Sequence, residues 1–235
     1  MSKMVGLSRA IKQEWLDKTV ELISQIKNEQ EIKEKLDEYL SFEIKSPTNL
    51  RKTREILLNI WFRSSVTSAT IWNEAVTALE KDTANRLAIN WSMILFSYPV
   101  FFDVCDLIGK INMMQDTFTT SWLKEKLLSI WGGRTTLYHS TDKILQTLKN
   151  LGAIENVKMG TYRICKYQLT DNDTLKVMLM VLLALNKKAY YEVPELSRIP
   201  MFFPFDYDVT LEWLQNKKGL HIGNFGGKIV ISAEE

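Results

Sequence analysis

The sequence predicts a mainly helical α+β chain in which a helical domain precedes a smaller module that contains strands. Through residues 7–115, apolar side chains recur at the spacings of three and four that are typical of amphipathic helices. Beyond residue 150, short strand-like runs flank glycine turns. We therefore expect an all-helical bundle over residues 1–115, a mixed module over 116–170, and a C-terminal helix with a β-hairpin, packed on the preceding parts, over 171–235.

The length and composition are those of a globular protein. The 235 residues are 46% hydrophobic and 25% charged, which is enough apolar content to bury a sizeable core. No run reaches the roughly 18 apolar residues that a membrane helix needs, and the best candidate, 177–185, is about half that length. The first residues lack the pattern of a secretion signal. We expect a cytoplasmic protein without a membrane partner.

The first helices are predicted by apolar spacing and by one break. Residues 7–40 carry apolar side chains spaced for a packed helical face. Pro47 then suits the first position of a new helix, and Ser46 is placed to cap it. The first turns of this helix carry cations, where the helix dipole disfavours them: Arg51, Lys52 and Arg54. This placement indicates an anionic partner or an acidic neighbour, although an ordinary solvated surface also explains it.

Residues 63–115 continue the helical part. Apolar stripes run from Trp72 to Leu79 and from Ala84 to Leu95. Pro99 is expected to break or kink the chain, and the core continues beyond it. Five of the seven tryptophans fall before residue 125 at core-like spacings, so we interpret them as packing residues rather than as platforms for stacked bases.

A close succession of elements follows between residues 119 and 169. Glycines end both helices of this segment, and the turn Lys158–Thr161 has hairpin chemistry. The elements, in order, are a helix over 120–131 with Trp122, Leu123, Leu127, Ile130 and Trp131 on its apolar face, a turn at Gly132–Gly133, a helix over about 136–151, and strands over 153–157 and 162–169. This order is the signature of a winged helix.

The second helix of this module separates an apolar stripe from a polar outer face. The stripe comprises Leu137, Ile144, Leu145, Leu148 and Leu151, and the outer face is left with Tyr138, His139, Thr141, Lys143, Gln146 and Lys149. Residues 121–170 carry eight Lys or Arg against three Asp or Glu, a net charge of +5, whereas the rest of the chain sums to −3. Concentrated positive charge is what the neutralisation of phosphates requires. It favours duplex binding, with a solvated surface or a protein-docking face as alternatives.

The last 65 residues are expected to cover the other parts. A helix over about 174–188, capped by the polar residues 171–173, is apolar nearly all round and must be buried on most sides. Two strands over 220–225 and 228–232 flank Gly226–Gly227, a strong two-residue turn signal. An aromatic loop with Phe202, Phe203 and Phe205 lies between this helix and the two strands. We interpret it as a lid over the apolar helix, and the alternative is an exposed partner surface.

Motifs of catalysis and cofactor binding are missing from the sequence. There is no phosphate-binding glycine loop and no nucleophile elbow. Cys105 and Cys165 have no partner at a metal or redox spacing and are interpreted as reduced thiols, and His139 and His221 are the two histidines. Acidic pairs such as Asp103 with Asp106 are explained by helix capping. We expect no enzyme, no cofactor and no metal site.

Two segments resemble the BrxA family of bacteriophage exclusion (BREX) systems. Ser46-Pro47-Thr48-Asn49-Leu50-Arg51-Lys52-Thr53-Arg54 is similar to its basic, helix-opening element, and Trp131–Thr136 with Lys143–Gly152 is similar to the turn and helix before its wing. The resemblance implies a small, non-enzymatic component of a phage-defence operon, with affinity for duplex DNA and a helical part similar to the antitermination factor NusB. It provides no catalytic residue.

Our first hypothesis is a DNA-binding accessory protein of BREX that binds other BREX proteins, with a homodimer as one option. The second helix of the module would enter the major groove while the wing touches phosphate. The candidate DNA-binding residues are Arg51, Lys52, Arg54, Arg134, Tyr138, His139, Lys143, Gln146, Lys149, Lys158, Arg163 and Lys166. A second hypothesis, favoured by the small net charge of +2 and by the aromatic loop, is an assembly adaptor. In it, the winged-helix module and the loop from Phe202 to Phe205 dock other defence proteins, and DNA affinity is incidental. RNA binding is a third, without an aromatic strand surface to support it.

Overall fold

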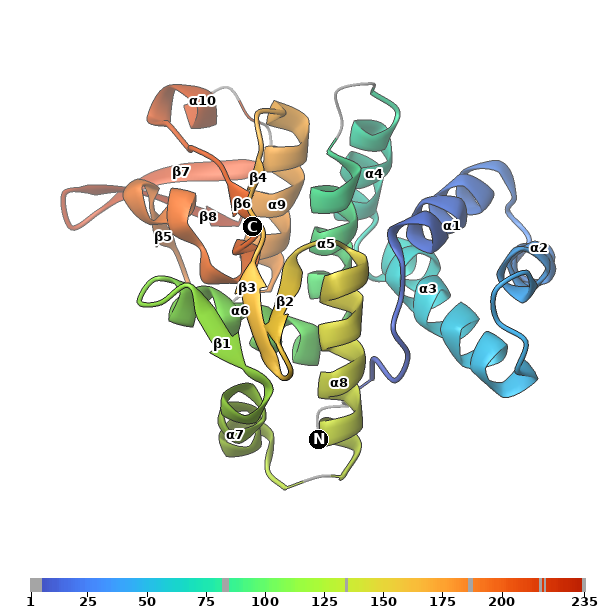
Figure 1. The fold of residues 1–235 in the computed structure, drawn as a ribbon. Coiled ribbons are helices and arrows are strands. Elements are labelled where there is room, and N and C mark those ends of the chain that lie inside the picture. Colours follow the sequence, from blue (N-terminus) through green and yellow to red (C-terminus); the bar gives the residue numbers. More distant parts are fainter. Residues whose placement is uncertain are drawn as a thin grey trace.

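The computed structural model describes residues 6–81, 85–133, 135–185, 188–215, 217 and 219–233, and of 64–67 and 233 it describes the backbone alone. The protein is mainly helical with small sheets, as the sequence predicts (Figure 1). The first half contains α1 (Gln13–Gln25), α2 (Glu29–Ser41), α3 (Pro47–Thr67), α4 (Ala69–Leu79), α5 (Arg86–Ser97) and α6 (Pro99–Asn112).

Local sequence signals set the ends of these helices. Asn28 caps α2 by accepting from the backbone N–H groups of residues 30 and 31, and Asn85 caps α5 by accepting from that of Ala88. Pro47 opens α3, and Ser46 Oγ accepts from the N–H of Asn49 at 3.4 Å, as the sequence predicts. Pro99 opens α6, whose axis turns by 119° from that of α5.

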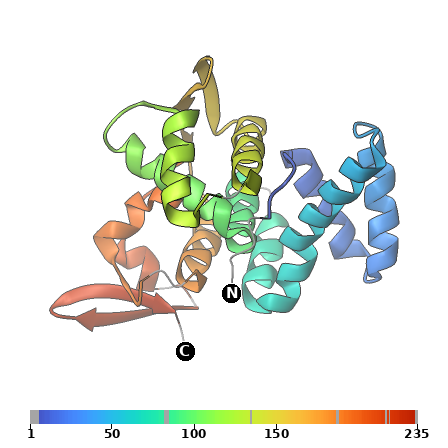
Figure 2. The same cartoon turned by 90° about the horizontal axis from the view of Figure 1, so that it is seen from below.

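The middle of the chain folds into two helices and a three-stranded sheet. Its elements are β1 (Thr117–Thr119), α7 (Thr120–Trp131), α8 (Thr135–Asn150), β2 (Ile154–Lys158) and β3 (Thr161–Ile164). All strand pairs are antiparallel and the order is β1-β3-β2, so the first strand closes against the last. Gly160 makes the β2–β3 turn with φ 68°, a conformation that favours glycine. Figure 2 shows the hairpin extending beside α7 and α8.

The C-terminal part packs back onto the helical part. It contains β4 (Tyr167–Gln168), α9 (Asn172–Ala184), β5 (Tyr191–Glu192), the 3₁₀ turns η1 (Val193–Arg198) and η2 (Pro200–Phe202), β6 (Phe205–Asp206), α10 (Leu211–Gln215), β7 (Leu220–Phe225) and β8 (Lys228–Ala233). The apolar helix α9 contacts α4 and α5, which explains why it is buried nearly all round. The predicted terminal hairpin is confirmed, with Gly226 and Gly227 at positive φ in its turn.

The aromatic loop is a lid, although it covers different helices from those expected. Phe202, Phe203 and Phe205 are 1%, 5% and 4% exposed. The rings of Phe203 and Phe205 lie 5.2 and 5.7 Å from that of Trp91 on α5, whose Nε1–H donates to Met201 O. The loop therefore packs on α5 and α6 rather than over α9. This burial removes it as an exposed partner surface.

The N-terminal segment connects the helical part with the middle module. Residues 6–12, hereafter the strap, are not helical, so the expected helix from residue 7 begins only at Gln13. Leu7 and Ile11 are fully buried, and in Figure 1 the strap runs in dark blue between α8 and the first helices. The N–H of Ile11 donates to Thr147 Oγ1 at 3.1 Å, and its carbonyl accepts from Asn150 Nδ2 at 3.0 Å. Side chains of α8 thus take the hydrogen bonds that a helix would have used.

A single cluster of buried apolar side chains extends through the described chain from Leu7 to Ile231. Helix α6 contributes to it from both sides, because it contacts α5 as well as α7, α8 and β1. In the described part of the chain, no single helix is long and apolar enough to cross a membrane. Helices α5 and α6 together reach that length and composition, but with a sharp bend at Tyr98.

Candidate nucleic-acid interface

Helix α8 presents the polar face that the sequence predicts. Tyr138, His139, Lys143 and Gln146 are exposed and Lys149 is half-buried. The opposite side is buried in the core through Leu137, Ile144, Leu145, Leu148 and the following Leu151, all less than 5% exposed. Because these side chains fix the rotation of the helix, the polar residues share one direction outward.

Two side chains of the module lie opposite to expectation. Thr141 is fully buried, and its Oγ1 donates to Leu137 O at 2.8 Å, so it does not belong to the outer face. The hydrogen bond to its own helix satisfies the hydroxyl inside the core. Ile130 is 52% exposed although it was placed on the apolar face of α7, because Leu123, Leu127 and Trp131 already cover the contact with the core.

An acidic residue on the outer face of α8 is neutralised by α7. Asp142 is exposed beside Lys143, and its Oδ1 accepts from Lys124 Nζ at 2.6 Å. The same ammonium lies 5.8 Å from the ring centroid of Tyr138. Lys143 and Lys149 have no ion-pair partner among the described residues. The face therefore keeps two uncompensated cations, a balance that the sequence alone did not reveal.

The β2–β3 hairpin adds a third free cation. Lys158 is exposed at the end of β2 and makes no ion pair within the part that the structure describes. Arg163 is exposed on β3 but lies opposite Glu155 of β2, with 3.4 Å between Nη1 and Oε1. Exposed pairs of this kind are weak and exchange easily with solvent or another anion. Arg163 is thus available to a phosphate only in competition with Glu155.

Lys166 does not lie on the hairpin, contrary to the sequence-based assignment to the wing. Strand β3 ends at Ile164, and the chain then turns toward β4. Lys166 Nζ donates to Phe203 O at 2.9 Å and to Asp206 Oδ1 at 3.1 Å. These acceptors come from a segment far along the chain, so no local pattern could have predicted them. Arg134, also proposed, lies outside the described residues.

The three cations predicted on α3 have different surroundings. Arg54 forms ion pairs with Asp37 of α2 and with Glu55, and its side chain is only 16% exposed. The acidic-neighbour explanation is therefore correct for Arg54, which is not a free phosphate ligand. Arg51 and Lys52 are exposed. They lie on α3, on the other side of the strap from α8, so the structure does not place them on the same helix face as Lys143.

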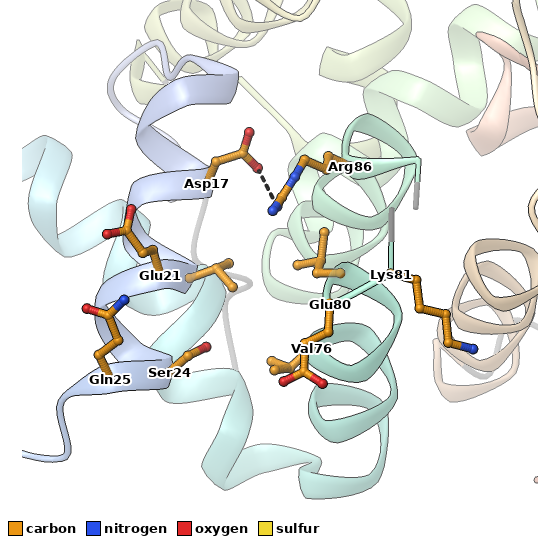
Figure 3. A pocket seen from close by; sticks show the side chains of 10 residues that line it. Asp17, Glu21, Ser24, Gln25, Val76, Glu80, Lys81 and Arg86 are labelled. Atoms are coloured by element: carbon orange, nitrogen blue, oxygen red, sulfur yellow. Dashed lines mark ion pairs between the residues drawn. The ribbon is translucent and has the colours of Figure 1, made fainter. Parts of the chain in front are cut away.

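A separate cleft lies between α1 and α4 and is lined by acids. Figure 3 shows Asp17 and Glu21 on one wall and Glu80 on the other, in a cleft of about 540 Å³. Arg86 reaches Asp17 at 3.9 Å, whereas Lys81 points away and pairs with Asp173. Carboxylates on both walls repel a phosphate backbone. This cleft is therefore not a candidate for phosphate contact.

Groups that carry chemistry are few in the described residues. No three His, Cys, Asp or Glu side chains gather there in a geometry that could hold a metal ion. Cys105 is fully buried, and burial raises the pKa of its thiol well above the ordinary value. Cys165 is half-buried, and its pKa is also raised by burial. Both thiols are free and protonated at neutral pH.

Exposed apolar side chains at the module are a feature that the sequence reasoning missed. Met159 at the turn of the β2–β3 hairpin is 98% exposed and Val157 is 47% exposed. The strand alternation of residues 154–158 was the only available signal, and it does not tell which face is covered.

Comparison of the chain with protein-family models, curated proteins and solved structures found no match.

Proposed function

We propose that this chain is a non-enzymatic, DNA-binding accessory component of a BREX-type phage-defence system, with a winged-helix domain that binds duplex DNA. The observation that carries the proposal is the combination of topology and surface in the middle module. A helix, a strand, two helices and a hairpin follow one another as α6, β1, α7, α8 and β2–β3, with the sheet order β1-β3-β2. The second helix of the pair, α8, turns a polar face to solvent. This order of elements supports the proposed winged helix.

The surface of α8 suits the major groove of DNA. The groove is about 12 Å wide and admits one helix, whose side chains then reach base edges and flanking phosphates. His139 and Gln146 are hydrogen-bonding groups suited to base edges, and Lys143 and Lys149 are suited to phosphates. Gln146 Nε2 donates to Asn150 Oδ1 at 2.9 Å in the free protein, so base contact would require it to exchange that partner. Lys158 on the hairpin would contact the neighbouring backbone.

The charge of this surface predicts moderate affinity. Each phosphate contact contributes about 0.9 to the slope of log K against log salt concentration. With Lys143 and Lys149 of α8 and Lys158 of the hairpin as the cations that meet phosphate, the module alone accounts for a slope of roughly 2.7. A single basic helix discriminates weakly between sequences, so dimerisation or other BREX proteins would supply the rest of the specificity.

The likeness to BREX proteins supports the assignment at two places in the fold. The first similar segment forms the start of α3, and the second spans the α7–α8 connection and most of α8. A NusB-like helical part formed by the first helices belongs to the same proposal. It is supported by the mainly helical first half, not by a match to any known protein.

The proposal is tested by fluorescence anisotropy on duplex DNA, single-stranded DNA and duplex RNA across a salt series. We expect binding that prefers duplex DNA and weakens steeply with salt. Replacement of both Lys143 and Lys149 by Ala should lower the slope by up to about 1.8. The control is Lys27→Ala with Lys35→Ala, which removes two exposed cations that make no ion pair in the described structure and lie away from α8. No duplex binding at low salt would refute the proposal.

A second candidate function, an assembly adaptor, is favoured by the exposed apolar side chains of the module. Val157, Met159 and Ile130 are all at least 47% exposed. An apolar hairpin tip is a plausible contact for another BREX protein. Co-purification of such a partner should then survive nuclease and high salt, and Met159→Ser should weaken it. Loss of every partner on nuclease treatment would exclude this function.

A further inference from the structure

A cleft of about 300 Å³ lies between the strap and α3, on the far side of the strap from α8. Gly6 and Ser8 of the strap line one wall, and Arg51, Lys52, Glu55 and Arg63 of α3 line the other. The α3 residues that line it recur at helical spacing, so one side of that helix forms the wall, with Ile56 at its buried edge.

The cleft carries more positive charge than the surrounding protein compensates. Arg63 is paired with Glu55 at 2.7 Å. Arg51 and Lys52 have no acidic partner among the described residues, and the neighbouring Arg9 of the strap donates to the neutral amide oxygen of Asn49 and to a backbone carbonyl. Neutral partners leave the three charges uncompensated, and an anion placed among them would be stabilised.

The wall formed by the strap is fixed in place. Gly6 has φ 71°, and a Cβ built there would come within 2.7 Å of the Tyr98 ring, so the backbone lies directly on that ring. Leu7 is fully buried, and the bond from Arg9 to Asn49 ties the strap to the first turn of α3. The cleft is thus present before any ligand arrives, which lowers the cost of ordering it.

The strap also sets the distance between this cleft and α8. Arg9 is bonded to α3 and Ile11 to Thr147 of α8, and two residues of chain span at most about 7 Å. A helix in the major groove has a phosphate backbone on each side, in a groove about 12 Å wide. A backbone that flanks α8 on the side of the strap would therefore run toward Arg9 and the cleft beside it.

We propose that the cleft between the strap and α3 binds backbone phosphates of the same DNA duplex that α8 contacts, with Arg51, Lys52 and Arg9 as the ligands. This inference rests on the proposed duplex binding and extends it to a second, non-sequence-specific contact. The total slope of log K against log salt concentration should then exceed that of the α8 module by up to about 2.7, since three more cations meet phosphate.

The test compares three double variants of the full chain by anisotropy on one duplex across a salt series. Arg51→Ala with Lys52→Ala should lower the slope by up to about 1.8 and should add to the effect of the Lys143 and Lys149 replacements. Lys27→Ala with Lys35→Ala, which removes the same charge elsewhere, should leave it unchanged. All six side chains are at or near the surface, and far-UV circular dichroism during heating checks that each variant folds.

The outcomes separate the two proposals. A slope that falls for the α8 variant but not for the α3 variant overturns the cleft contact and leaves the duplex function standing. No duplex binding by the unchanged protein overturns both. Inorganic phosphate is titrated separately by calorimetry. Phosphate binding that the α3 variant loses, without any change in its duplex slope, would mean that the cleft takes a free phosphate compound, and it would also overturn the backbone contact.

Discussion

The bond between the strap and α8 predicts an unequal effect of two similar substitutions. Thr147 and Thr141 both lie on α8 and both are fully buried. Thr147 Oγ1 accepts the Ile11 N–H at 3.1 Å and donates to Lys143 O, whereas Thr141 Oγ1 only donates to Leu137 O within the helix. Valine keeps the shape of threonine and removes the hydroxyl. Thr147→Val therefore leaves a buried backbone donor without an acceptor, and Thr141→Val does not.

The expected difference follows from that single donor. A buried donor that loses its partner costs about 1–3 kcal/mol, while the loss of a hydroxyl whose acceptor keeps its helical bond costs less than about 1 kcal/mol. In a chain of this size each kcal/mol corresponds to about 2–4 °C in the melting temperature. Thr147→Val should be less stable than Thr141→Val by about 1–3 kcal/mol in urea unfolding at pH 7. Equal stabilities for the two variants would show that the strap does not depend on this bond.

Two further predictions concern packing and pH. A Cβ on Gly109 of α6 would overlap the carbonyl of Pro200, so Gly109→Ala should lower the free energy of unfolding by about 1–3 kcal/mol by displacing the aromatic loop. Gly133→Ala is the control, because a Cβ there meets no atom within 4 Å, and it should change the urea midpoint little. Similar midpoints for the two variants would contradict this prediction. Hydrogen bonds from Lys12 and Trp15 lower the pKa of Glu43 below its ordinary 4.5. Its ionised form therefore adds stability at neutral pH that is lost as the pH falls through that lowered pKa. Glu43→Gln should lower the urea midpoint at pH 7, and this deficit should shrink as the pH falls below 4.5. A deficit that stays constant over that range would exclude the charged hydrogen bond as its cause.

Periodicity predicted the elements whose apolar faces are fixed by local sequence. On α8, Leu137, Ile144, Leu145 and Leu148 are buried as the spacing requires, because a helix that packs on one side must place them together. Turn chemistry located both hairpins, since glycine is the residue that accepts the positive φ of their turns. Pro47 and Ser46 located the start of α3 for the same kind of local reason.

Long-range contacts explain what the sequence did not predict. Strand β1 is three residues long, too short for an alternating pattern, and it exists because it pairs with β3 more than 40 residues later. The strap forms no helix because its partners are on α8. Lys166 and Arg54 were candidate phosphate ligands in the sequence, but each forms an ion pair with a carboxylate of another element. Lys166 pairs with Asp206, and Arg54 pairs with Asp37. Charge in a sequence therefore gives candidates for phosphate contacts, and pairing in the fold decides among them.

The same reasoning resolves the apparent conflict between a net charge of +2 and duplex binding. Counterion release depends on the cations that meet phosphates, not on the sum over the whole surface. Three acids line the cleft between α1 and α4, while Asp142 and Glu155 near the proposed interface each pair with a neighbouring base. The cations that we assign to phosphate contacts make no ion pair within the described residues: Arg9 on the strap, Arg51 and Lys52 on α3, Lys143 and Lys149 on α8, and Lys158 on the hairpin. A nearly neutral protein can thus present a local positive surface, and its salt dependence is the quantity that reveals it.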